Sequence, residues 1–141
     1  MARPSVAIAN PSPVAGPYGP FIGLAVEALL IAIILGSRGF NPIRFFYSWG
    51  LVTAFTFLLL IGGFYVFDHL DRATGVIPDG GGIVLFFMAE GAIVFIEAIA
   101  LWRLSQAKFF QRSQKEVAAL TFPHAFNIAF MVNFVSFLFG I

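Results

Sequence analysis

Four long apolar segments constrain the fold of this chain more than any other feature. They cover residues 21–36, 45–67, 82–104 and 120–141. A transmembrane α-helix needs about 20 predominantly apolar residues, a length that the short first segment reaches if residues 18–20 extend it. Charged residues make up only 11% of the chain, whereas a soluble domain carries roughly 25%. The sequence therefore predicts an all-α protein, an integral membrane four-helix transmembrane bundle over residues 21–141.

Residues 1–20 differ in composition from the rest of the chain. Five of the eight prolines lie there, with Gly, Ser and Ala between them. Proline fixes φ and removes a backbone donor, which favours an extended tail over a helix. A signal peptide would place a basic region directly before its apolar run, but Arg3 is the only basic residue of this segment. We expect an extended Pro/Gly-rich tail that is not cleaved.

The charges between the apolar segments predict the topology. Six Lys and Arg residues lie in the first and third loops, whereas the second loop carries three aspartates and one arginine: Arg38 and Arg44; Arg103, Lys108, Arg112 and Lys115; Asp68, Asp71, Asp79 and Arg72. Cytoplasmic loops carry the excess of Lys and Arg. We therefore predict that the first and third loops face the cytoplasm and that both termini lie on the non-cytoplasmic side. Four aromatic residues are expected near the membrane interfaces: Tyr47, Trp49, Tyr65 and Trp102.

Three glutamates lie inside the apolar segments. Glu90 and Glu97 are seven residues apart, almost two helical turns, so they point to the same side of their helix. With antiparallel neighbours, Glu27 is expected at the depth of Glu90, and Glu97 at the depth of His124 and Asn127. The sequence thus predicts two layers that bind a proton or a cation, formed by these five residues. Further polar side chains are expected to complete the layers: Ser48, Thr53, Thr56, Asn133 and Ser136.

Carboxylates inside a bilayer need a physical explanation. A charged acid there costs about 2.5–3.5 kcal/mol on insertion scales, so such residues are rare and usually functional. Two facing carboxylates in a dry site do not both ionise. No basic residue lies deep in any apolar segment, so protonation, a bound cation or a partner chain must satisfy the acids. The alternative is that they only fix the packing of the helices.

Other chemistries find less support in the sequence. The absence of cysteine excludes thiol chemistry and Cys-based zinc or iron–sulfur sites. His69 and His124 are expected most of a bilayer apart, so they cannot bind one haem within a monomer, which leaves a pair across a homodimer as the alternative. The DHLD stretch, 68–71, is interpreted as a solvated turn rather than a divalent-cation site. The net charge of +1, without a basic cluster, gives no reason to expect a nucleic acid partner.

The stretch LAVEALL, residues 24–30, places Glu27 in the first helix of a four-helix chain. In these two respects the chain resembles the small multidrug resistance transporters, which carry one essential glutamate in their first helix. The resemblance implies an essential role for Glu27. It covers this stretch and the helix count alone, because the family has no acids that correspond to Glu90 and Glu97, and this chain has a longer tail and longer loops.

Three functions agree with these patterns. The first is proton- or cation-linked transport or energy coupling by an oligomer, which we expect. The second is a non-catalytic transmembrane subunit of a larger membrane complex. The third is a membrane enzyme or cofactor-binding subunit that uses His124 and the acids, although the sequence identifies no catalytic residue, metal site or cofactor. The expected partners are the lipid bilayer and either further copies of the chain or other membrane subunits.

Overall fold

The computed structural model describes residues 19–75, 81–112 and 117–138. Within them the chain forms four α-helices and one short 3₁₀-helix: α1 (Gly19–Ser37), α2 (Pro42–Thr74), α3 (Gly81–Gln106), η2 (Lys108–Phe110) and α4 (Phe122–Leu138). These residues contain no β-strand, so the prediction of an all-α chain with four helices is confirmed. Residues 1–18 of the expected tail lie outside the described residues, and assigning 19 and 20 to that tail was wrong because α1 begins at Gly19.

Helix α2 is longer at both ends than the predicted 45–67. The side chain of Asn41 accepts a hydrogen bond of 3.2 Å from the Arg44 backbone N–H, and Pro42 follows in the first turn, where its missing N–H has no helical partner to lose. The helix ends at Gly75, whose left-handed backbone (φ 61°) lets its N–H donate to the Asp71 carbonyl. The interpretation of 68–71 as a turn is therefore wrong: no glycine or proline interrupts residues 64–74.

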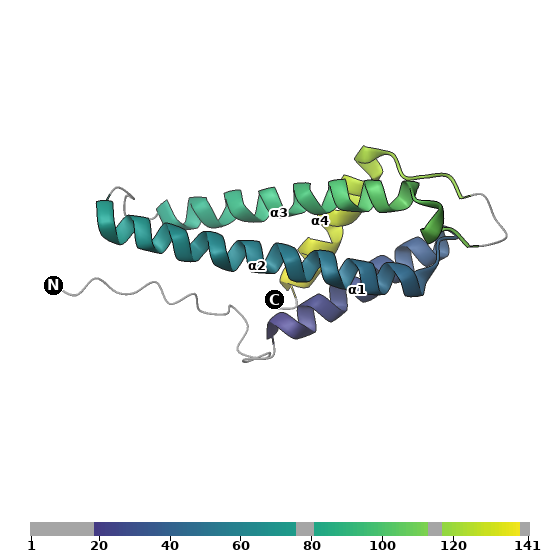
Figure 1. Cartoon of the computed structure of the whole chain (residues 1–141), viewed down its shortest axis with the longest axis horizontal. Helices are drawn as coiled ribbons and strands as arrows, with labels where there is room; N and C mark the ends of the chain where they lie inside the picture. Colours follow the sequence, from purple (N-terminus) through teal and green to yellow (C-terminus); the bar gives the residue numbers. More distant parts are fainter. Residues whose placement is uncertain (1–18, 76–80, 113–116, 139–141) are drawn as a thin grey trace.

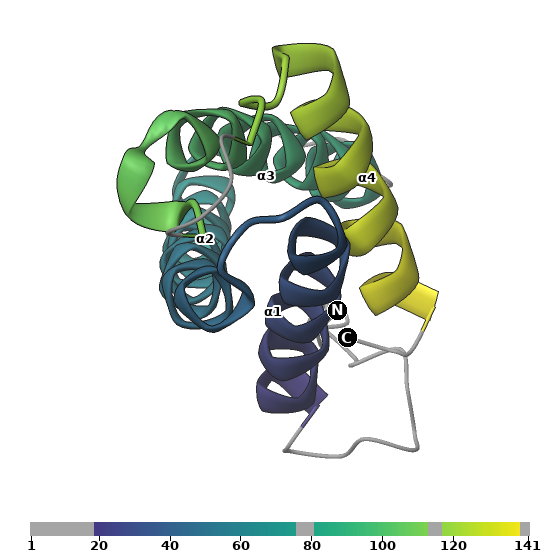
Figure 2. The same ribbon diagram turned by 90° about the vertical axis from the view of Figure 1, so that its right-hand side faces the viewer.

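Helices α2 and α3 form a long antiparallel hairpin (Figure 1). Helices α1 and α4 lie against one end of this hairpin and leave its other end, where α2 ends and α3 begins, uncovered by them. Viewed along the hairpin, α4 crosses obliquely from α3 towards α1 (Figure 2). This crossing brings the second half of α4 close to both α3 and α1, which decides which of its side chains meet the acids.

The main core lies at the covered end of the hairpin. Its largest fully buried side chains come from α1, α2 and α3 and from the loop after α1: Ile31, Leu35, Phe40, Phe45, Trp49 and Leu101. A second, smaller cluster joins Val94 and Ala98 of α3 to Ala129 of α4. Trp49, expected near a membrane interface, is fully buried within this core, so its side chain is not on the outer surface.

The first and third loops meet at the covered end. The backbone N–H of Asn41 donates to the Phe110 carbonyl at 2.8 Å, and the Arg44 guanidinium donates to the Phe109 carbonyl and lies over the Phe109 ring. Gly39 turns the chain out of α1 with φ 98°, a left-handed conformation that favours glycine. The two basic loops therefore lie at the same end of the molecule.

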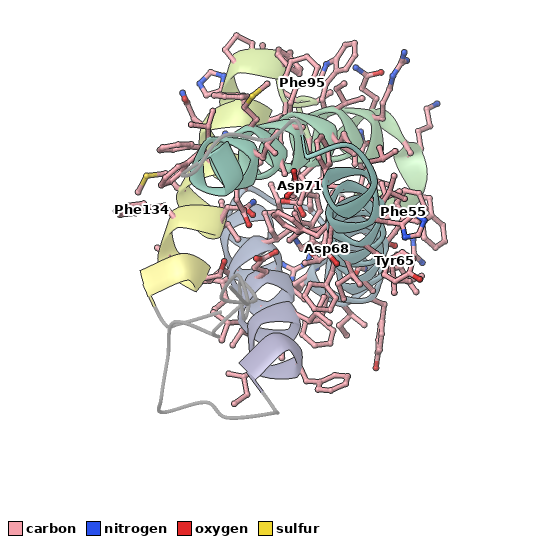
Figure 3. All side chains as sticks on the ribbon, turned by 90° about the vertical axis from the view of Figure 1, so that its left-hand side faces the viewer. Phe55, Tyr65, Asp68, Asp71, Phe95 and Phe134 are labelled. Atoms are coloured by element: carbon pink, nitrogen blue, oxygen red, sulfur yellow. The ribbon has the colours of Figure 1, made fainter. Side chains whose placement is uncertain are left out.

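Large apolar side chains cover much of the outside. Figure 3 shows Phe55 and Tyr65 of α2, Phe95 of α3 and Phe134 of α4 directed away from the helices on different sides. Asp68 and Asp71, near the end of α2, lie instead on the side of that helix that faces the middle of the view. By length and composition, one helix among the described residues is able to cross a membrane: α2 over Pro42–Asp71, with a mean hydropathy of 2.1.

Candidate functional site

Glu97 of α3 is fully buried where α2, α3 and α4 meet. The Thr56 hydroxyl of α2 lies 2.9 Å from Glu97 Oε1, and the Asn133 amide of α4 donates to Glu97 Oε2. Both Glu97 oxygens are therefore engaged by side chains of two other helices. The Glu97 side chain therefore links α3 to both α2 and α4 by polar contacts.

Glu27 of α1 is also buried, and it has a similar partner on α4. The Ser136 hydroxyl lies 2.7 Å from Glu27 Oε1. Glu27 Oε2 is buried without a hydrogen-bond partner, as is the hydroxyl oxygen of Thr53 on α2. Thr53 nevertheless lies near enough to interact with the Glu27 carboxyl group. A small movement would let the Thr53 hydroxyl donate to the Glu27 carboxyl group and satisfy both atoms.

Six side chains from all four helices form one closed polar arrangement, which we call the polar ring: Glu27, Thr53, Thr56, Glu97, Asn133 and Ser136. Two pairs of polar residues with a spacing of three build it. Thr53 and Thr56 lie one turn apart on α2, and Asn133 and Ser136 lie one turn apart on α4. Residues three apart share a helix face, so each pair contacts both acids. Thr53 and Ser136 lie at Glu27, and Thr56 and Asn133 lie at Glu97. All members except the partly exposed Asn133 are buried.

The polar ring is anionic or neutral, with no basic member. Among the contacts of the described residues, neither Glu27 nor Glu97 is bonded to Lys, Arg or His. The two carboxyl groups are near enough for their charges to repel, and Glu90, half-buried further along α3, is a third acid within electrostatic reach. Two charges of the same sign in a buried site raise the free energy of the doubly ionised form. The ring is therefore suited to hold a proton or another small cation.

The structure corrects the two expected layers. Glu97 is bonded to Asn133, not to Asn127 or His124, because the oblique path of α4 brings its later turns, not its first turn, to Glu97. The side chains of Asn127 and His124 are exposed, and His124 Nδ1 shares a hydrogen bond of 2.7 Å with the Thr121 hydroxyl. Glu27 lies within electrostatic reach of both Glu90 and Glu97, so its expected proximity to Glu90 is not contradicted. The polar contacts nevertheless join Glu27 and Glu97 in one ring.

Four of the five polar residues that were expected to complete the layers belong to the ring; Ser48 does not. The sequence contained a signal for their grouping, the spacing of three in Thr53/Thr56 and Asn133/Ser136, but that signal does not say which acid each pair meets. Helix crossing angles decide this, and they depend on side-chain packing along the whole contact.

A metal centre or a known family is not indicated. Among the described residues no three His, Cys, Asp or Glu side chains are grouped so that they could hold a metal ion. Comparison with protein families, with curated proteins and with solved structures gives no match.

Proposed function

We propose that this chain is a multi-pass integral membrane protein whose polar ring binds a proton or a small cation, linked to transport or energy coupling in an oligomer. The observation that carries the proposal is the burial of Glu27 and Glu97, from different helices, with hydroxyl and amide partners and no basic partner. A buried acid with such partners exchanges a proton or cation more readily than one held in a salt bridge, because no fixed positive charge competes for its oxygens.

The outer surface supports the membrane part of the proposal. Leu51, Leu58 and Tyr65 of α2 are between 66% and 74% exposed, and similar side chains lie on the other helices. A soluble monomer rarely exposes such a continuous apolar surface, whereas lipid would cover it favourably. Helix α1 rises about 28 Å over its 19 residues and α3 about 39 Å over its 26. These lengths suit a hydrocarbon core of about 30 Å, and the basic loops would then face the cytoplasm.

The proposal is tested by flux. The full-length chain is reconstituted in lipid vesicles that contain a pH-sensitive dye, and proton movement is recorded under an imposed membrane potential. We expect flux above that of empty vesicles, loss of that flux in Glu97→Gln, and retention in the matched control His124→Gln, whose side chain lies outside the ring. Equal flux in wild type and Glu97→Gln would contradict the proposed role of the ring.

The uncovered end of the α2–α3 hairpin favours a second candidate, a non-catalytic subunit of a larger membrane complex. There, apolar side chains of both helices line a shallow groove that α1 and α4 do not reach: Leu59, Leu60, Gly63, Phe64 and Phe67 of α2, and Leu85, Ala89, Ala92, Ile93 and Ile96 of α3. The half-buried Glu90 lies on the same part of α3. Absence of flux from the chain alone, with a native mass that includes other proteins, would favour this candidate.

A further inference from the structure

Two hydroxyl groups of the polar ring each lie within hydrogen-bond distance of two acceptor oxygens, although each has only one proton to donate. The Thr56 oxygen lies 2.9 Å from Glu97 Oε1 and 3.0 Å from the Thr53 backbone carbonyl oxygen. The Ser136 oxygen lies 2.7 Å from Glu27 Oε1 and 2.9 Å from the Asn133 carbonyl oxygen. A hydroxyl has one proton to donate and two lone pairs that accept. Neither hydroxyl can therefore donate to both of its neighbours at once.

A proton on each acid resolves both conflicts. If Glu97 Oε1 carries a proton, it donates to Thr56, and Thr56 donates to the Thr53 carbonyl. If Glu27 Oε1 carries a proton, it donates to Ser136, and Ser136 donates to the Asn133 carbonyl. Every hydrogen bond named above then has one donor and one acceptor. The same order of donors and acceptors occurs at Glu97 and at Glu27, so the inference does not depend on a single distance.

The Asn133 amide agrees with this arrangement and argues against a metal cation. Its nitrogen lies within hydrogen-bond distance of both Glu97 Oε2 and the Ala129 carbonyl oxygen, which lies 2.9 Å away. Two acceptors on one atom identify it as the NH₂ group, which has two protons to donate. Glu97 Oε2 therefore faces an N–H donor, which repels a cation, whereas a protonated Glu97 uses Oε2 as an ordinary carbonyl acceptor.

We propose that the ligand of the polar ring is the proton itself, held on Glu97 Oε1 and Glu27 Oε1, and that Thr56 and Ser136 are positioning residues whose hydroxyl groups reverse direction when their acid ionises. This inference rests on the proposed function and names the ion that the function left open. When Glu97 releases its proton, the Thr56 O–H turns from the Thr53 carbonyl to the carboxylate, and one proton leaves the ring. Ser136 turns in the same way from the Asn133 carbonyl to Glu27.

The reversal needs no movement of heavy atoms. Each hydroxyl oxygen already lies within 3.0 Å of both acceptors, so rotation of the O–H bond alone exchanges them. The titratable groups near the two acids are acids themselves: Glu90 of α3 acts on Glu27, and Glu27 and, to a smaller extent, Glu90 act on Glu97. Helices α2 and α4 contribute only hydroxyl and amide groups to the ring. Proton uptake at one of these acids therefore changes the electrostatic field at its acidic neighbours.

Infrared spectroscopy of the purified full-length chain in lipid tests the proposal, because a protonated carboxyl group has its own C=O stretching band. The band is followed as the pH is changed in buffer without alkali-metal ions, and its Glu97 component is assigned by its loss in Glu97→Gln. In Thr56→Val, which removes the hydroxyl at nearly constant shape, we expect this component to move to higher wavenumber, because the acid has lost its hydrogen-bond acceptor. Thr56→Ser should restore the original position.

Two further variants keep the test decisive. Thr121→Val removes an exposed hydroxyl outside the ring and should leave the band unchanged. If Thr56→Val does not fold, Ser136→Ala provides the equivalent test for the Glu27 component, assigned in Glu27→Gln. An unchanged component in a folded Thr56→Val or Ser136→Ala chain would overturn the roles of these hydroxyls.

Adding sodium chloride or potassium chloride distinguishes a failure of the proton assignment from a failure of the proposed function. If either salt removes the protonated-carboxyl band at constant pH, the ligand is a metal cation, so the proton assignment fails while the proposed cation-linked function stands. If the band is insensitive to salt and disappears only with rising pH, the proton assignment is supported. Absence of any band over the accessible pH range overturns the proton assignment, and the separate vesicle measurement on Glu97→Gln then decides whether the proposed function also fails.

Discussion

Asn133 of α4 donates a hydrogen bond to Glu97 of α3, and its nitrogen also reaches the Ala129 carbonyl of its own helix. This amide is the point at which the oblique α4 is joined to the α2–α3 hairpin by a polar contact. The apolar contacts beside it, Val94 and Ala98 against Ala129, involve small or medium side chains. The register of α4 on α3 therefore depends on a specific polar pair as well as on apolar packing.

The first prediction follows from this contact. Asn133→Leu removes the donor and leaves the buried Glu97 Oε2 unsatisfied, so we expect a loss of about 1–3 kcal/mol in the free energy of unfolding. Asn127→Leu is the matched control on the same helix, because its side chain is exposed and should change stability by less than about 0.5 kcal/mol. Denaturant unfolding in detergent micelles measures both. Equal losses in the two variants would show that the Asn133 contact does not specify the packing.

A pair of glycine substitutions tests the turn after α1. Gly39 has φ 98°, and an added Cβ would lie 3.1 Å from Val117 Cγ2, so we expect Gly39→Ala to destabilise the fold by about 1–3 kcal/mol. Gly62 lies inside α2 with open space around the position of a Cβ. Gly62→Ala should instead stabilise the helix by roughly 0.5–1 kcal/mol. Thermal unfolding of the two variants should show midpoints displaced in opposite directions, and the same direction for both would refute this account of the turn.

Arg44 connects the first and third loops through a planar contact that lysine cannot reproduce. Its guanidinium donates to the Phe109 carbonyl and lies 4.3 Å from the centroid of the Phe109 ring. Arg44→Lys keeps the charge but loses the fork of donors and the stacking, and we expect it to lower stability by about 1 kcal/mol. Arg38→Lys, at an exposed position of the first loop, is the control. We expect a protease to cleave after Lys108 faster in Arg44→Lys than in wild type, because the third loop is less firmly held, and at the wild-type rate in Arg38→Lys.

The sequence predicted the number and type of the helices because long apolar runs separated by charged loops leave few other structures. It placed the end of α2 seven residues early, since Asp68, His69 and Asp71 look like loop residues by polarity. The helix continues because no glycine or proline interrupts 64–74, and polarity alone does not break a helix. Helix ends are set by capping groups, and Gly75 was the informative residue.

The acids of the candidate site were predictable, whereas their partners were not. Glu27 and Glu97 stand out because carboxylates are rare in apolar segments. Matching the depths of antiparallel helices placed Glu97 beside His124 and Asn127, which assumes that α4 runs parallel to the hairpin axis. The oblique crossing seen in Figure 2 shifts the contact to Asn133. That angle arises from packing between helix surfaces and has no signature in the spacing of polar residues.

The proposed topology predicts a labelling pattern in intact cells. Cysteines introduced at Ser37 and Lys108, exposed positions at the end where the basic loops meet, should be protected from a membrane-impermeant reagent added outside. A cysteine at the exposed His69, near the opposite end of the hairpin, should be labelled. The native chain has no cysteine, so no background labelling arises. Labelling of Ser37→Cys and Lys108→Cys, with protection of His69→Cys, would invert the orientation.

The last prediction concerns the contact of α2 with lipid. Leu58 is 66% exposed near the middle of the apolar stretch Pro42–Asp71, and Ile43 is 67% exposed near its start. In a bilayer, lysine at the centre of a helix costs about 2.5–3.5 kcal/mol, whereas near an end its long side chain reaches the interface. We therefore expect Leu58→Lys to reduce the fraction of chain that resists alkaline extraction from membranes, while Ile43→Lys leaves that fraction close to wild type. In water both substitutions would replace an exposed apolar side chain by a charged one and would improve solubility equally. Recovery of Leu58→Lys as folded soluble protein would therefore show that this face of α2 does not contact lipid.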